Sequence, residues 1–186
     1  MFQTRIHGRG GQGVVTAAEL LSVAAFLEGR HAQAFPSFGS ERMGAPVMSF
    51  CRIDDKEIRL REPVQKPDAL IIQDPTLLHS VDVFGGLNPN GYILINSRRR
   101  FDELGIAEFV AGFPAHHVCD LGATELAMKH VGRPLPNAAL LGGFAAISGQ
   151  LHMDSVAQAI MQKFPGPVGE ANVAAAREAY DIAANS

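Results

Sequence analysis

A glycine-rich loop near the start of the chain is the segment best suited to chemistry. Its residues are Gly8, Arg9, Gly10, Gly11, Gln12 and Gly13. Because glycine has no side chain, the backbone can turn sharply here and leave its N–H groups uncovered. The helix predicted over residues 14–28 begins directly after the loop and places the partial positive charge of its N-terminus in the same space. The loop therefore predicts a contact with an anionic group, most often a phosphate. The alternative is that the glycines only allow the strand and the helix to pack closely.

Three of these glycines also have the G-x-G-x-x-G spacing of a dinucleotide-binding loop, and a predicted strand, residues 2–7, precedes them. In such proteins an acidic residue at the end of the second strand binds a ribose hydroxyl. The second predicted strand, residues 31–35, ends at Phe35-Pro36 and carries no carboxylate there. NAD binding by a free-standing Rossmann-like protein is therefore our second hypothesis.

A second irregular loop, residues 36–46, follows that strand, close to the place where a ligand on the glycine loop would lie. We expect Ser40, Glu41 and Arg42 to contribute to the same binding region. We also favour a local ion pair between Glu41 and Arg42 that shapes the loop over general acid–base catalysis by these residues.

Candidate catalytic residues are few. The histidines lack the spacing of a zinc-binding helix motif, and His116 and His117 would point to opposite faces of a predicted strand. Asp74 and Asp120 lie near the ends of predicted strands, where ligands often bind, but we favour helix capping as their role. We predict no catalytic residue and no metal site in this chain.

The composition is that of an ordinary globular protein, with 186 residues, 47% hydrophobic and 19% charged, and a net charge of −3. This balance gives no reason to expect nucleic acid as a partner. The basic cluster Arg98, Arg99 and Arg100 is interpreted as a solvated loop, with an anion or subunit contact as the alternative. Cys51 and Cys119 lie in separate apolar runs, so we expect buried thiols. With no signal peptide expected and no apolar stretch long enough for a membrane span, we predict a cytoplasmic protein.

The predicted elements form one α/β domain over residues 1–186. A β-α-β unit covers residues 2–35, and compact apolar runs at residues 69–72 and 91–96 predict buried parallel strands. An antiparallel hairpin is expected from residues 47–53 and 57–60, joined by turn residues. A shorter strand is expected at residues 116–120. Helices are expected at residues 76–84, 123–130, 138–150 and 170–184, and another is expected to be capped by Asp154 or Ser155 and to run to about residue 164. Residues 101–110 are expected to form a weaker helix or a turn. Together these elements predict a three-layer α/β/α fold with a mixed, mostly parallel sheet and an inserted β-hairpin.

Several segments in sequence order resemble the gamma subunit of the pyruvate/2-oxoacid:ferredoxin oxidoreductase family. The resemblance begins at residues 8–21 and continues through residues 34–47. It returns at Pro67-Asp68, Asp74, Asn96-Ser97 and residues 137–142. Motifs that cover nearly the whole chain in this order are far more specific than the glycine loop alone.

The resemblance implies a non-catalytic subunit of an enzyme that oxidatively decarboxylates a 2-oxoacid. In this family the thiamine diphosphate, its Mg²⁺ and the [4Fe–4S] clusters lie on other subunits, expected here to be alpha, beta and ferredoxin-like delta chains. Coenzyme A usually accepts the acyl group, and ferredoxin or another acceptor takes the electrons. The glycine loop with Ser40, Glu41 and Arg42 is then expected to contact coenzyme A near subunit interfaces. A purely structural subunit is the third hypothesis, and the sequence does not determine which 2-oxoacid is used.

Overall fold

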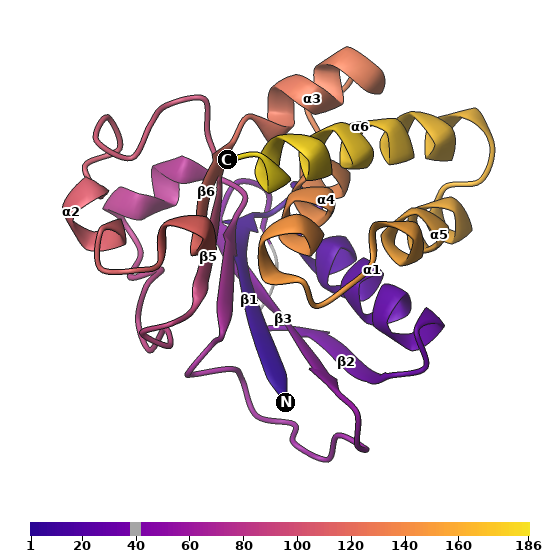
Figure 1. The fold of residues 1–186 in the computed structure, drawn as a ribbon, viewed down its shortest axis with the longest axis horizontal. Coiled ribbons are helices and arrows are strands. Elements are labelled where there is room, and N and C mark those ends of the chain that lie inside the picture. The colour runs from indigo at the N-terminus through magenta and orange to yellow at the C-terminus, as the bar shows by residue number, and fades with distance from the viewer. Residues whose placement is uncertain (38–41) are drawn as a thin grey trace.

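The computed structural model describes residues 1–37 and 42–186 and contains a six-stranded sheet with the order β2-β3-β1-β4-β5-β6 (Figure 1). The strands are β1 (Phe2–Arg9), β2 (His31–Pro36), β3 (Pro46–Asp54), β4 (Ala69–Ile72), β5 (Tyr92–Asn96) and β6 (Val118–Leu121). Strands β1, β4, β5 and β6 pair in parallel, whereas β3 runs antiparallel to both β1 and β2. The sheet is therefore mixed and mostly parallel, as the sequence predicts.

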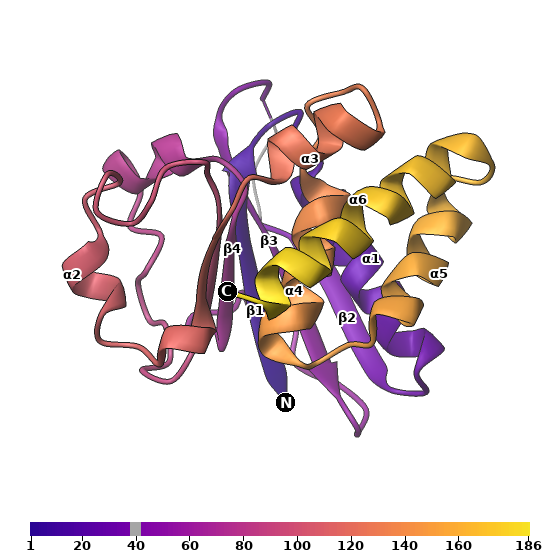
Figure 2. The same cartoon turned by 45° about the horizontal axis from the view of Figure 1, so that its top comes forward.

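Helices of very different length cover the two faces of the sheet (Figure 2). The α-helices are α1 (Val14–Leu27), α2 (Ala107–Val110), α3 (Ala123–His130), α4 (Asn137–Ser148), α5 (Met153–Lys163) and α6 (Pro167–Ala184), and the 3₁₀-helices are η1 (Pro75–His79) and η2 (Ala115–His117). Helices α1 and α4 pack on one face, and α5 and α6 pack against them. On the opposite face a smaller apolar cluster joins β4 and β5 to η1, α2 and the irregular segments around them. These layers give the predicted α/β/α architecture.

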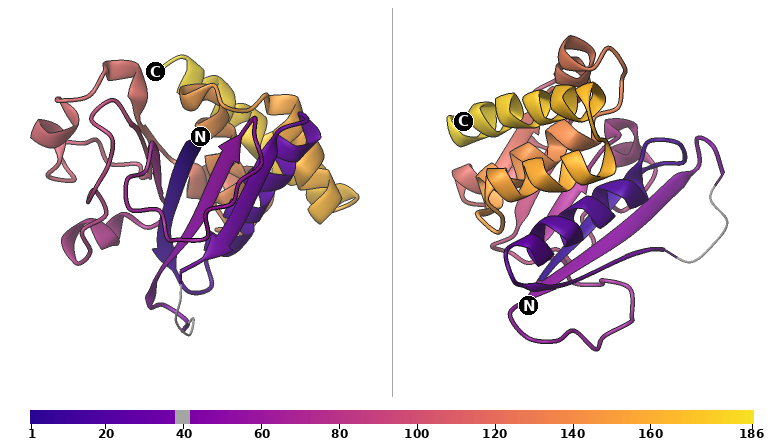
Figure 3. Two further views of the ribbon diagram at one scale, coloured as in Figure 1. Left: turned by 90° about the horizontal axis from the view of Figure 1, so that it is seen from below. Right: turned by 90° about the vertical axis from the view of Figure 1, so that its right-hand side faces the viewer.

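The helical layer is tight because small residues line its contacts. Helix α4 contains Gly142, and a Cβ atom added there would lie 1.9 Å from the backbone oxygen of Ala176 on α6. Only glycine allows this approach, which explains the Ala- and Gly-rich sequence of α4. Figure 3 shows α4 and α6 side by side, with α1 along the sheet next to them. The helix predicted at residues 138–150 is thus α4, and it packs tightly against α6.

The buried side chain of Arg5 anchors the irregular segments that cover the second face of the sheet. Arg5 on β1 donates hydrogen bonds to the carbonyl oxygens of Val83 (3.0 Å) and Gly85 (2.7 Å), and its Nε donates to His7 Nε2 (3.0 Å). Burial, followed by the nearby charge of Arg5, lowers the pKa of His7 to about 3, so this ring is neutral and accepts the hydrogen bond. The long connections that lack regular structure are thus anchored to the central strand.

Several predicted elements differ in the structure. The hairpin strand expected at residues 57–60 is absent, because both edges of β3 are already paired with β1 and β2. Side chains hold this segment instead, since Gln33 Nε2 donates to Leu60 O and Arg52 donates to Glu62 O. The predicted β-α-β unit does place β2 parallel to β1, but β3 lies between them, so they are not neighbours.

Other differences concern element ends. The helix expected at residues 76–84 is only the 3₁₀-helix η1. The segment 101–110, expected as a weaker helix or a turn, contains turns followed by the short helix α2. Helix α5 begins at Met153 with His152 as its N-cap, so neither predicted cap is correct. His116 and His117 lie in η2 rather than in a strand, and their rings meet edge to face with centroids 4.6 Å apart. No helix within residues 1–37 and 42–186 combines the length and apolar character that crossing a bilayer requires.

Candidate functional site

The carboxyl ends of the parallel strands meet at one edge of the sheet, where the glycine loop follows β1. In open α/β folds, ligands bind in the crevice at this edge. Helices α1 and α3 both begin there, directly after the glycine loop and after β6. Their N-termini carry partial positive charge, so the edge favours anions.

The glycine loop packs against the described end of the second loop, residues 42–45. Gly10 N donates to Ala45 O (2.8 Å), and Gly44 N donates to Gly10 O (3.0 Å). A Cβ on Gly10 would lie 2.0 Å from the backbone oxygen of Arg42. The glycine at position 10 is therefore required by the close contact of two backbones, which favours the packing interpretation for this residue.

The other glycines of the loop are required for different structural reasons. A Cβ on Gly8 would lie 2.4 Å from Val14 Cγ2, and one on Gly11 would lie 2.4 Å from Met43 Sδ. Gly13 has a φ of 74° and is the N-cap of α1, a left-handed conformation that glycine adopts without strain. The loop thus combines close packing with a sharp turn into the helix.

Arg9 and Gln12 hold the loop together. The Gln12 Oε1 atom accepts a hydrogen bond from Arg9 N (2.8 Å), and Gln12 Nε2 donates to Asp74 Oδ2 (2.9 Å). The Arg9 guanidinium donates to Gly44 O (3.0 Å) and Thr76 Oγ1 (2.9 Å) and lies 3.2 Å from Asp74 Oδ2. Both side chains that we expected at an anion site therefore have partners within the protein.

Asp74, at the start of η1, contacts Arg9, Gln12 and Thr76. Its Oδ1 accepts hydrogen bonds from Thr76 N (3.0 Å) and Thr76 Oγ1 (2.6 Å), which confirms the predicted capping role. Partial burial opposes its charge, but the hydrogen bonds from Thr76 and Gln12, with the charge of Arg9, outweigh this, so the pKa of Asp74 is below its usual range. Asp74 is therefore a stable carboxylate at neutral pH.

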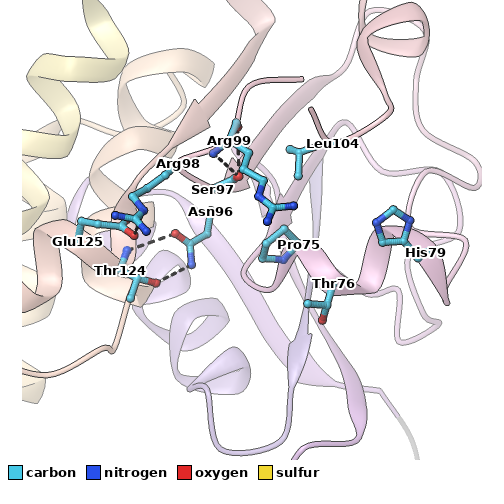
Figure 4. Close-up of a pocket in the computed structure, with 10 residues that line it drawn as sticks. All are labelled: Pro75, Thr76, His79, Asn96, Ser97, Arg98, Arg99, Leu104, Thr124 and Glu125. Atoms are coloured by element: carbon cyan, nitrogen blue, oxygen red, sulfur yellow. Dashed lines mark hydrogen bonds and ion pairs between the residues drawn. The ribbon is translucent and has the colours of Figure 1, made fainter. Parts of the chain in front are cut away.

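A hollow of about 490 Å³ lies beside this network, between η1 and the start of α3 (Figure 4). We call it the edge hollow. It is lined by Pro75, Thr76, His79, Asn96, Ser97, Arg98, Arg99, Leu104, Thr124 and Glu125. These residues lie at the end of β5 or in the segments after β4, β5 and β6, so three parallel strands contribute to one space at their carboxyl ends.

Asn96 and the two arginines define the chemistry of the edge hollow. The Asn96 side chain donates to Thr124 Oγ1 (2.9 Å), and its Oδ1 accepts from the N–H groups of Ala123 (3.1 Å) and Thr124 (3.2 Å). It thereby takes the capping role at α3 that we predicted for Asp120, which is not the cap. Arg98 pairs with Glu125 (3.1 Å), whereas the Arg99 guanidinium extends over Pro75 (Figure 4).

The predicted site residues are thus partly brought together. Residues 8–13 and Arg42 form one cluster, whereas Ser40 and Glu41, with their expected ion pair, lie outside the described residues. The edge hollow adds Arg98 and Arg99, which we had interpreted as a solvated loop, and Asn96, which carried no predicted role. The run of three arginines that begins two residues after a buried strand was the sequence signal for this part of the site.

The next question is whether the described residues could hold a metal ion. No group of three or more His, Cys, Asp or Glu residues there could hold a metal ion. Cys51 and Cys119 are buried, and burial raises their thiol pKa values to about 12 and about 11. Two separated cysteines cannot by themselves hold a [4Fe–4S] cluster, which takes four cysteine ligands.

Comparisons with known proteins agree on one family. The family profile of pyruvate ferredoxin/flavodoxin oxidoreductases matches residues 3–182. The chain is 45% identical to pyruvate synthase subunit PorC of Methanothermobacter thermautotrophicus, over 97% of this chain and 95% of that protein. It is 44% identical to the common subunit gamma of the pyruvate/ketoisovalerate oxidoreductases of Pyrococcus furiosus, over 97% and 96% of the two chains.

A solved structure supports the same assignment. The crystal structure of pyruvate oxidoreductase subunit PORC from Thermotoga maritima matches with a TM-score of 0.81 and 32% sequence identity, covering 97% of this chain and 95% of that one. The similarity therefore extends through the whole sheet and its helices. The chain belongs to the pyruvate ferredoxin/flavodoxin oxidoreductase family, in which its relatives are gamma-type subunits.

Proposed function

We propose that this chain is the gamma subunit of a multi-subunit 2-oxoacid:ferredoxin oxidoreductase and forms part of its coenzyme A region and subunit interfaces. The names of its relatives, with matches over nearly the whole of both chains, support the subunit assignment. Oxidative decarboxylation of a 2-oxoacid then takes place on the partner subunits. In this assignment the chain binds and orients a substrate but supplies no reacting group.

The edge hollow is the observation that carries the coenzyme A part of the proposal. Coenzyme A is rich in phosphate, and arginine is well suited to bind phosphate through two parallel hydrogen bonds. Arg98 and Arg99 line the edge hollow, and α3 begins beside it. The glycine loop lies next to it, joined through the Asp74 network, so residues 8–13 with Arg42 would form its neighbouring rim. The sequence expectation that Ser40 and Glu41 contribute to the same coenzyme A contact is part of this proposal.

The remaining cofactors belong, in this proposal, to partner chains. Thiamine diphosphate, Mg²⁺ and the [4Fe–4S] clusters would be held by alpha, beta and ferredoxin-like delta subunits, and ferredoxin or another acceptor would take the electrons. The two separate, buried cysteines of this chain do not supply the four ligands of such a cluster by themselves. Which 2-oxoacid is decarboxylated would be decided by the partner that holds the thiamine.

The test is the substitution Arg99→Ala in the assembled complex. Among the described residues, the Arg99 guanidinium has no ion-pair partner, so its removal leaves no buried charge behind. Loss of one charge-assisted hydrogen bond of about 1.5 kcal/mol predicts a KM for coenzyme A about tenfold higher. Arg59→Ala, at an exposed arginine that does not line the edge hollow, is the matched control and leaves this KM unchanged.

A purely structural subunit is the second candidate, and the packing of Gly10 against residue 42 favours it. For that candidate, Arg99→Ala leaves the KM for coenzyme A unchanged while the complex still assembles and turns over. A free-standing NAD-binding protein is disfavoured because β2 ends at Pro36 without a carboxylate. Tight binding of NADH to the purified chain in calorimetry would reverse that conclusion.

A further inference from the structure

Asp74 lies between the edge hollow and two loops that are distant in sequence. Its two carboxylate oxygens have separate partners. Oδ1 accepts both hydrogen bonds from Thr76, which lines the edge hollow. Oδ2 accepts from Gln12 Nε2 (2.9 Å) and lies 3.2 Å from Arg9 Nε, so it faces the glycine loop. One side chain thus performs two tasks, of which helix capping is only the first.

The contacts continue from Asp74 into the 42–45 segment. Arg9 bonds simultaneously to Thr76 Oγ1 and to Gly44 O. The Gly44 amide in turn donates to Gly10 O, and the Gly10 amide donates to Ala45 O. A continuous chain of polar contacts therefore connects the wall of the edge hollow with both loops, and the carboxylate of Asp74 is its junction.

We propose that Asp74 is a positioning residue that fixes the glycine loop and the 42–45 segment against the wall of the edge hollow. Its Oδ2 atom neutralises Arg9 and orients Gln12, and these two side chains hold the loop backbones in place. The effect of Asp74 on coenzyme A binding rests on the proposed function, whereas its effect on the loops does not. A helix cap alone would need only Oδ1.

The substitution Asp74→Asn separates the two tasks. Asparagine has the same shape and keeps an oxygen for Thr76, but it places an amide where Gln12 and Arg9 need an acceptor. Hydrogen–deuterium exchange of the Gly10 and Gly44 amides reports directly on the two loops. Loss of a charge-assisted hydrogen bond predicts about tenfold faster exchange at these amides, with the Ser80 amide of η1 unchanged. Unchanged exchange at both loop amides would overturn the proposal.

A second variant covers the case in which Asp74→Asn loosens the whole chain. Gln12→Ala removes one donor to Oδ2, together with the acceptor of the Arg9 N–H group, and leaves the cap at Thr76 intact. Faster exchange at Gly44 in this variant supports the positioning role, and wild-type exchange there refutes it.

Kinetics of the assembled complex test the proposed effect of Asp74 on coenzyme A binding. Asp74→Asn is expected to raise the KM for coenzyme A severalfold while leaving kcat at saturating coenzyme A unchanged, because positioning affects binding and not the reacting groups. Faster amide exchange in the two loops with an unaltered KM for coenzyme A would overturn the proposed effect of Asp74 on coenzyme A binding. If Arg99→Ala leaves the KM unchanged and Asp74→Asn still loosens the loops, the proposed coenzyme A contact fails while the positioning role stands.

Discussion

The substitution Gly10→Ala tests whether the glycine loop exists to let two backbones meet. A Cβ at this position would lie 2.0 Å from Arg42 O, which is 1.4 Å short of an ordinary 3.4 Å contact. The atom it meets belongs to the backbone, so no side-chain rotation relieves the clash, and the 42–45 segment must move away. That movement breaks the hydrogen bonds from Gly10 N to Ala45 O and from Gly44 N to Gly10 O.

The expected cost follows from these two bonds. At about 0.5–1.5 kcal/mol each, their loss lowers the free energy of unfolding by about 1–3 kcal/mol. Urea denaturation of the purified chain measures this value, with an unchanged m-value showing that the unfolded state is the same. The matched control is Gly112→Ala, where the added Cβ meets only Phe109 O at 3.5 Å and φ is not positive. That control should be neutral or more stable by up to about 1 kcal/mol, because alanine restricts the unfolded chain. Equal stability of Gly10→Ala and wild type would refute the reasoning.

Two further predictions, one at His7 and one at the contact of α4 with α6, test other parts of the structure. Wild type should lose about 2 kcal/mol between pH 7 and pH 5 through His7, because the unfolded chain protonates this residue near 6.5 while the folded state keeps it neutral with a pKa of about 3. His7→Gln, which retains an acceptor for Arg5, should therefore show a smaller loss over this range in urea denaturation, and a parallel pH dependence would contradict the assignment. Gly142→Ala should destabilise the chain by about 2 kcal/mol, because the new methyl group meets the backbone of Ala176. Gly143→Ala meets the end of the Leu121 side chain instead of backbone, so its cost should be smaller, and equal costs for the pair would show that α4 and α6 can separate freely.

The sequence predicts best where a segment is decided by its own residues. The continuous apolar runs of β4 and β5 predict strands buried on both faces, and the structure confirms them within one residue. Helix α3 has the predicted bounds, and α1 ends one residue early. The predicted cap at Asp74 is also confirmed, since a cap depends on residues two positions apart.

Errors arise where the outcome depends on distant partners. Residues 57–60 have the alternation of a strand, but β3 offers no open edge for them. Asp120 lies one residue before the end of β6, yet Asn96 from the neighbouring strand reaches the N-terminus of α3 first. Each of these outcomes was decided by competition for the same hydrogen bonds.

The same division applies to the site. The sequence by itself determined the glycine loop between β1 and α1, because the required turn and the helix N-terminus are local properties of residues 8–14. Only the tertiary structure decided that Gly10 meets the 42–45 segment, that Asp74 holds Arg9 and Gln12, and that three strand ends form the edge hollow. These contacts join residues from separate strands and loops, and their geometry is fixed by the antiparallel pairing of β1 with β3 and the parallel pairing of β1, β4, β5 and β6 rather than by any local pattern.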